Sequence, residues 1–263
     1  MGADAVSTGT VIDLKEVQHH GHVTRDEGET TPMTTARQAR TIFRPLAKRN
    51  PDFAYTGGRS LWLTPIRHTV SRVFIDRTSD SGSFQIGWAI LATFIPEHSL
   101  PGTIGNCAGK LYPFDQDQFA YWEWSDPAAI SAAIPIIEAE ALPHLRSFDG
   151  LESWATYYRE TFPIALKGFP HERLILDIAL GNLPAAHAQL AKLLPHFREN
   201  KHPDQPMYQY MRSLILPVAE PLLADDRPAL AAILHGWESE NIRTAKLERY
   251  WEPTPFPLER APT

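Results

Sequence analysis

The stretch Phe84–Ile95, FQIGWAILATFI, decides the fold that we expect for this chain. Apolar residues stand at every second position from Phe84 to Phe94, which is the side-chain period of a β-strand. The positions between them are also largely apolar, with Ala89 and Leu91 among them. A strand that is apolar on both sides is covered on both, so we expect this one in the interior of a sheet.

A partner strand is expected immediately before it. Residues 79–83, SDSGS, form a turn cluster, and the strand-like run at 70–75, VSRVFI, precedes that turn. The two runs therefore predict a hairpin of long strands. A helix is expected before the sheet, because Thr34 or Thr35 can cap apolar residues at helical spacing. Those apolar residues are Ala36, Ala39, Ile42, Phe43 and Leu46.

Helical patterns dominate the rest of the chain. Asp126 suits the N-cap of a helix and Pro127 suits the first helical position, so a helix is predicted to begin here. We expect Pro135 to kink this helix and Pro143 to end it. From Pro170 onward every segment has a helical pattern. We expect these helices at 172–180, 184–197, 208–223 and 227–250.

Two of these helices begin alike, with GNLPAA at 181–186 and DDRPAL at 225–230. The likeness suggests two helical hairpins of similar build, although shared capping chemistry explains it equally well. The sequence therefore predicts an α+β protein. Its antiparallel sheet is packed with helices and followed by an all-helical C-terminal part of two helical hairpins.

Four regions are expected along the chain. Residues 1–33 are predicted to be a flexible N-terminal tail, because they hold too few apolar residues to form a core. The sequence leaves open whether Met33 is the native start. An α+β domain is expected at 34–165 and the helical hairpin region at 166–250. Residues 251–263 are rich in proline but also hold tryptophan and phenylalanine, so we expect them to pack along the body as a strap.

Composition narrows the classes of function. The 263 residues include 31 acidic and 25 basic ones, and the net charge of −6 argues against broad binding to nucleic acids or anionic membranes. A local basic patch is still compatible with it, and a basic partner would be attracted. The single cysteine forms no intramolecular disulfide. No secretory signal or membrane-length apolar run is found, so we expect a cytoplasmic protein. No cofactor-binding motif is found either, so we expect no cofactor.

The first strands hold a candidate set of ligand-binding residues. On strict alternation His68 and Arg72 share one face with Trp62, while Arg67 points away from it. A cationic face lined by aromatic rings could bind a phosphate, a carboxylate or an acidic peptide. An exposed face on which arginine stems lie across rings explains the same pattern. The full candidate set is Arg59, Trp62, Arg67, His68 and Arg72.

The C-terminal end supplies a second candidate set, for binding a partner protein. Trp237 and Asn241 lie on the last expected helix, and Trp251 and Phe256 lie in the proline-rich segment that follows. Tryptophan and phenylalanine contribute strongly to protein interfaces. The alternative is that these residues pack within the molecule.

Three histidines form the densest group of potential metal ligands. His19, His20 and His22 could together hold zinc, nickel or copper. They fall in the predicted tail and no cysteine lies near them, so adventitious binding is the stronger interpretation.

Several phrases resemble a known family. WAILATFIPEHS follows the expected hairpin, ALPHLRSFDGLESW closes the next helix, and ERLILDIALGNLPAAHAQLAKLL comes after it. Together they resemble a bacterial family of domains of unknown function that occur beside polymorphic-toxin immunity genes. The resemblance covers Thr35 to Phe197. It implies an α+β fold and a protein-binding role, and it supplies no catalytic residues.

These observations favour a non-enzymatic protein-binding module, with an immunity-like or antitoxin-like role. Its partner would be another protein, such as a basic toxin attracted by the acidic chain. One alternative is a small enzyme or anion-ligand binder that uses Arg67, His68 and Arg72. Another is a scaffold subunit that associates through its C-terminal helices.

Overall fold

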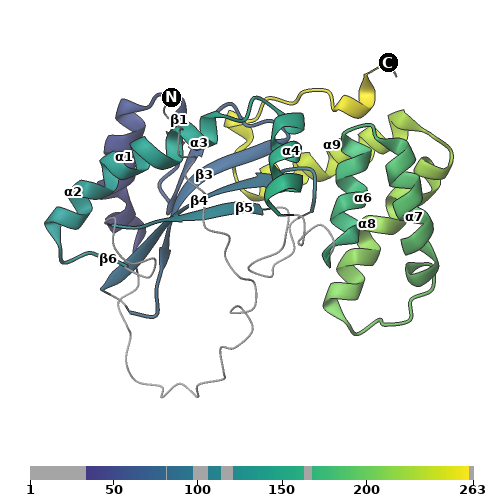
Figure 1. The fold of residues 1–263 in the computed structure, drawn as a ribbon, viewed down its shortest axis with the longest axis horizontal. Coiled ribbons are helices and arrows are strands. Elements are labelled where there is room, and N and C mark those ends of the chain that lie inside the picture. Colours follow the sequence, from purple (N-terminus) through teal and green to yellow (C-terminus); the bar gives the residue numbers. More distant parts are fainter. Residues whose placement is uncertain (1–33, 81, 97–105, 114–120, 163–167, 261–263) are drawn as a thin grey trace, which may run out of the picture. The chain divides into compact units, whose positions relative to one another are not determined.

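The computed structural model in Figure 1 describes residues 34–80, 82–96, 106–113, 121–162 and 168–260. All of them belong to one structural unit, Met33–Thr263. The expected tail at 1–33, with His19, His20 and His22, lies outside the described residues.

Six strands form one antiparallel sheet, which confirms the α+β class (Figure 1). The order β1-β2-β3-β4-β5 follows the chain, and β6 pairs with the start of β4. The expected hairpin of long strands is confirmed, since β3 and β4 pair from Thr69 opposite Ala92 to Arg77 opposite Phe84. The strands are β1 (Phe53–Tyr55), β2 (Ser60–Leu63), β3 (Thr69–Arg77), β4 (Ser83–Ala92), β5 (Asn106–Leu111) and β6 (Trp122–Glu123).

One face of the sheet carries the main core. Helix α1 (Ala36–Arg49) packs on this face, and its four apolar residues at helical spacing, Ala39, Ile42, Phe43 and Leu46, are fully buried. Of the two expected caps, Thr35 is the N-cap: its hydroxyl accepts a hydrogen bond from the backbone N–H of Gln38. The amphipathic pattern of α1 therefore places it against the sheet, with its polar side outward.

A second helical segment runs from Pro127 to Arg146. It consists of α2 (Pro127–Ile136), the π-helical turn η2 (Ile137–Ala141) and α3 (Leu142–Arg146). The expected N-cap is confirmed, because the Asp126 side chain accepts a hydrogen bond from the backbone N–H of Ala128.

The expected end of this helix at Pro143 is wrong. In a regular α-helix the proline ring collides with the carbonyl group of the preceding turn. Here the wider π turn comes directly before it, and the Leu142 N–H bonds to the Ile137 carbonyl. This turn accommodates Pro143, so the chain stays helical to Arg146.

The same segment, Pro127–Arg146, is long and apolar enough to cross a membrane by length and composition alone. About a third of it is buried inside the structure. One such helix is weak evidence for a membrane span, because the core helices of soluble proteins meet the same criteria. The structure is compatible with a soluble protein.

The remaining helices are α4 (Leu151–Thr161), α6 (Pro170–Ala179), α7 (Leu183–Phe197), α8 (Pro206–Leu223) and α9 (Arg227–Thr244). Each of the helices α6 to α9 contacts the next, and α6 also contacts α8 and α9. The division into two hairpins therefore stays a prediction. Helix α9 ends at Thr244 rather than at residue 250, because Lys246 adopts a left-handed conformation with φ 58°. The single turn η3 (Glu248–Tyr250) follows it.

The last residues run back over the body. Trp251 pairs with Ile66 in a parallel bridge, and Phe256 and Leu258 are fully buried beside the short turn η4 (Pro257–Glu259). We call residues 251–260 the C-terminal strap. Buried residues of the sheet, of α6 to α9 and of the strap belong to one continuous cluster. The expected domain limits at 165 and 250 stay predictions.

Candidate functional site

The sheet has a second face, which α1 does not cover. On this face Trp62 of β2 stands directly opposite Arg72 of β3, and Phe74 follows two residues later on the same side. The guanidinium carbon of Arg72 lies 5.5 Å from the ring centroid of Trp62 and 5.2 Å from that of Phe74. Both distances suit cation–π contacts, so the two rings hold the Arg72 charge in one place.

Two rows of side chains cross this face. The first runs through Trp62, Arg72, Ala89 and Ala108, which face one another on neighbouring strands. The second runs through Ser60, Phe74, Gly87 and Lys110. We call the part formed by Trp62, Arg72, Phe74 and Lys110 the open sheet face. Its side chains are half-buried or exposed, and its two charged groups are both cations.

Gly87 is required for the position of the Phe74 ring. A methyl group added to this glycine would lie 2.6 Å from the tip of that ring and 3.0 Å from the carbonyl oxygen of Gly109. The ring therefore lies flat across the backbone of β4. This contact explains why a glycine stands in the middle of a central strand.

The five residues predicted to bind a ligand do not converge. Arg59 pairs with Asp76 at 3.2 Å, and Arg67 pairs with Glu252 of the strap at 3.3 Å; both arginines are exposed. Only Trp62 and Arg72 lie together. His68 is buried and belongs to a different site.

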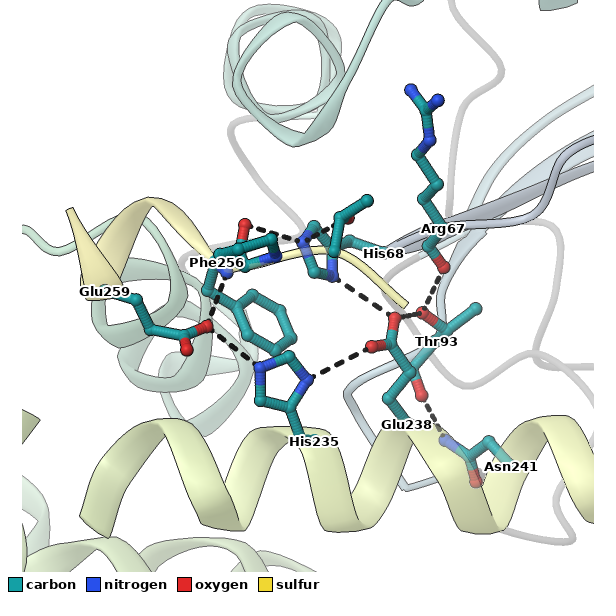
Figure 2. Close-up of polar contacts among 10 residues, drawn as sticks. Arg67, His68, Thr93, His235, Glu238, Asn241, Phe256 and Glu259 are labelled. Carbon is teal, nitrogen blue, oxygen red and sulfur yellow. Dashed lines mark hydrogen bonds and ion pairs between the residues drawn. The ribbon is translucent and has the colours of Figure 1, made fainter. Parts of the chain in front are cut away.

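That second site is a buried polar cluster centred on Glu238 of α9 (Figure 2). Glu238 is 0% exposed. Its Oε1 accepts a hydrogen bond from the Thr93 hydroxyl at 2.6 Å and lies 3.2 Å from His68 Nδ1. Its Oε2 lies 3.6 Å from His235 Nδ1, and His235 Nε2 lies 2.9 Å from Glu259 of the strap. We call these five residues the His–Glu cluster.

Aromatic stacking completes the contact between the cluster and the strap. The Phe256 ring stacks on His68 with centroids 3.9 Å apart and lies 4.7 Å from the ring of His235. His68 Nε2 lies 3.3 Å from the carbonyl oxygen of Pro255 and 3.2 Å from the Thr254 hydroxyl. The cluster therefore connects three parts of the chain: the sheet, α9 and the strap (Figure 2).

The residues predicted to bind a partner make contacts within the molecule. The Asn241 side-chain amide donates to the carbonyl oxygens of Thr93 and Ile95 at 2.7 and 2.8 Å. Phe256 is buried, and Trp251 packs with Ile242 and Leu247 beside the sheet. Trp237 is half-buried against the core. These contacts agree with the alternative interpretation of the sequence, in which the four residues pack within the molecule.

Helix α6 contains buried polar residues that the sequence analysis did not single out. Burial raises the pKa of Glu172 to about 8 and lowers the pKa of His171 to about 4. Neither side chain has a hydrogen-bond partner among the residues that the structure describes. Burial also raises the pKa of Asp177, although Arg159 lies 2.7 Å from it. In the sequence, the only sign is that His171 and Glu172 stand just before the apolar run LILDIAL and Asp177 within it, and this does not indicate the direction of a side chain.

No group of three or more potential metal ligands gathers in the described part of the chain. The chain was compared with protein-family models, with curated proteins and with solved structures, and it matches none of them significantly. The two sites are therefore interpreted from their own geometry.

Proposed function

We propose that this protein works by binding another protein, and that the open sheet face is its binding surface. The observation that supports this is the position of Arg72 between the rings of Trp62 and Phe74. Arginine and tryptophan contribute most to protein interfaces, and a side chain that is already ordered loses less entropy on binding.

The charges on this face favour a particular kind of partner. Arg72 and Lys110 are its charged residues, so a partner that presents carboxylates beside an apolar side chain would suit it. A basic toxin would suit the net charge of −6 but not this surface. The immunity-like role and the cytoplasmic location remain proposals based on the sequence.

The alternative of a small enzyme or anion binder has less support. It needs Arg67, His68 and Arg72 to point toward one ligand. Instead Arg67 faces Glu252, His68 faces Glu238 and Phe256, and Arg72 lies on two aromatic rings. No observation favours the scaffold role, association through the C-terminal helices, over protein binding or anion binding.

Co-expression with the products of the genes that flank its own gene tests the proposal. We expect one product to copurify, and we expect the double variant Trp62→Ala/Arg72→Ala to bind it at least tenfold more weakly, since hot-spot truncations cost about 2 kcal/mol or more. Lys192→Gln is the control, because Lys192 is an exposed cation of α7, a helix that contributes no residue to the open sheet face. Equal binding by the double variant, or no copurifying product, would count against the proposal.

A further inference from the structure

Helix α1 presents a line of cations to solvent. Arg37, Arg40, Arg44 and Lys48 are all exposed, and their spacing of three, four and four residues places them on one side of the helix. The opposite side is the fully buried apolar one. At 1.5 Å per residue the line is about 16 Å long. We call these four residues the α1 basic stripe.

Nothing that the structure describes neutralises this stripe. The sequence of α1, ARQARTIFRPLAKR, contains no acidic residue. Among the described residues, none of the four cations forms an ion pair, whereas neighbouring Arg49 pairs with Glu138 at 3.0 Å. Like charges three and four residues apart repel one another in a helix. An external anion would relieve that repulsion.

The net charge of the chain conceals this local field. Six of the 31 acidic residues, but only two of the 25 basic ones, precede residue 34. Residues 34–263 are therefore close to neutral. A row of cations that has no ion pair with any residue the structure describes, on a nearly neutral body, creates a local positive potential, even though the whole chain carries −6.

The composition of the exposed side of α1 selects among anionic partners. Apart from its cations this side shows only small or polar residues such as Ala36, Thr41 and Pro45. Insertion into a membrane needs apolar side chains, binding of single strands needs aromatic platforms, and protein interfaces need large anchors. Binding to a duplex backbone needs only cations, and arginine matches phosphate best.

We propose that the α1 basic stripe binds the phosphate backbone of double-stranded nucleic acid, without preference for base sequence. The duplex carries one phosphate about every 1.7 Å of its axis, both strands counted, so a line of about 16 Å lies beside enough phosphates for its four cations. This activity is separate from protein binding at the open sheet face, which lies on the other side of the sheet. Either can be lost without the other.

Fluorescence anisotropy with a labelled 20-base-pair DNA duplex tests the proposal. For four phosphate contacts we expect the logarithm of the binding constant to fall with the logarithm of salt concentration, with a slope of about −3.6. The exposed double variant Arg40→Gln/Arg44→Gln should bring that slope to about −1.8, since each lost contact removes about one unit. Glutamine keeps the helix propensity, and circular dichroism verifies folding.

The matched control is Lys192→Gln/Arg198→Gln, which removes two exposed cations at α7. It should leave both the affinity and the slope unchanged. The proposal fails if no binding occurs at 50 mM salt, or if the α1 double variant binds like the wild type. It also fails if poly-glutamate or phosphatidylglycerol vesicles bind as tightly as the duplex, because the ligand would then be an acidic polypeptide or a membrane.

Discussion

His68 and Arg72 are four residues apart, yet they belong to two regions with opposite environments. Arg72 lies on the open sheet face, over two aromatic rings and at least partly in contact with solvent. His68 lies in the His–Glu cluster, beneath the C-terminal strap. The difference comes from what packs on each residue: α9 and the strap bury His68, whereas the Arg72 side chain stays half-buried.

The comparison separates two uses of polar side chains. In the His–Glu cluster every polar group holds the fold together, because a buried charge is tolerated only with partners. On the open sheet face Lys110 is exposed and Arg72 is half-buried with its Nε atom covered, so part of each charged side chain reaches solvent. Substitutions should therefore affect stability in the first region and binding in the second.

The largest effect is expected from Glu238→Ala. It removes the buried carboxylate that bonds to Thr93 and faces His68, so His68 Nδ1 loses its partner and Thr93 keeps only its bond to the Arg67 carbonyl oxygen. We expect the free energy of unfolding in urea to fall by about 3–5 kcal/mol, as for other broken buried pairs. Glu240→Ala, an exposed position on the same helix, is the control and should change it by less than about 0.5 kcal/mol. A loss below about 1 kcal/mol at Glu238 would remove the distinction between the two regions.

A slightly smaller effect is expected from Phe256→Ala. The Phe256 ring is fully buried and contacts both histidine rings, so its loss leaves a cavity and loosens the strap. Unfolding experiments should show a loss of about 3 kcal/mol, and limited proteolysis should cut the strap sooner. Tyr121→Ala, at an aromatic residue that is 52% exposed, serves as the comparison and should have little effect.

Glu172 extends the comparison to a buried carboxyl group without partners. Its pKa of about 8 means that the folded state keeps a proton that the unfolded state loses above about pH 4.5. The free energy of unfolding should therefore fall as the pH rises, by about 2 kcal/mol from pH 6.5 to 8.

Glu172→Gln should remove that fall in stability. The titration of His171 has the opposite sign, because its pKa lies at about 4 in the folded state and near 6.5 when unfolded, but it is common to both proteins and cancels in their difference. Chemical denaturation of both proteins at several pH values measures the difference. An equal slope in the variant would show that Glu172 ionises freely in the folded protein.

The smallest effect on stability is expected from Arg72→Gln. A cation–π contact contributes about 0.5–1 kcal/mol at the surface and about 2 kcal/mol when desolvated, so for the half-buried Arg72 we expect a loss of about 1 kcal/mol. Affinity for the copurifying partner should nevertheless fall about tenfold. If this variant is destabilised as strongly as Glu238→Ala, the open sheet face is a structural element and not a binding surface.

Much of the fold could be predicted from local patterns. The strand from Phe84 to Ala92, the capped helix at Thr35 and the start of the helix at Asp126 follow from period and capping, which depend only on neighbouring residues. The alternation continued to Phe94, but β4 ends at Ala92. The end of the second of these helices could not be predicted, because the π turn before Pro143 is a response to packing.

The sites were less predictable. The strict alternation that joined Trp62 with Arg72 was informative, since both lie within paired strands. It could not indicate the burial of His68, which stands just before β3 and is covered by α9 and the strap. The partners of His68 come from positions 170 or more residues away, and no local pattern contains that information.

The sequence by itself determined the elements of this protein: an antiparallel sheet, the helices around it and the apolar side of each. These follow from periodicity, turn residues and caps, which act over a few residues. Only the tertiary structure decided which polar residues are covered and which stay accessible. That division arises when the strap and α9 pack on the sheet, because burial and the partners of a buried charge depend on residues distant in the chain.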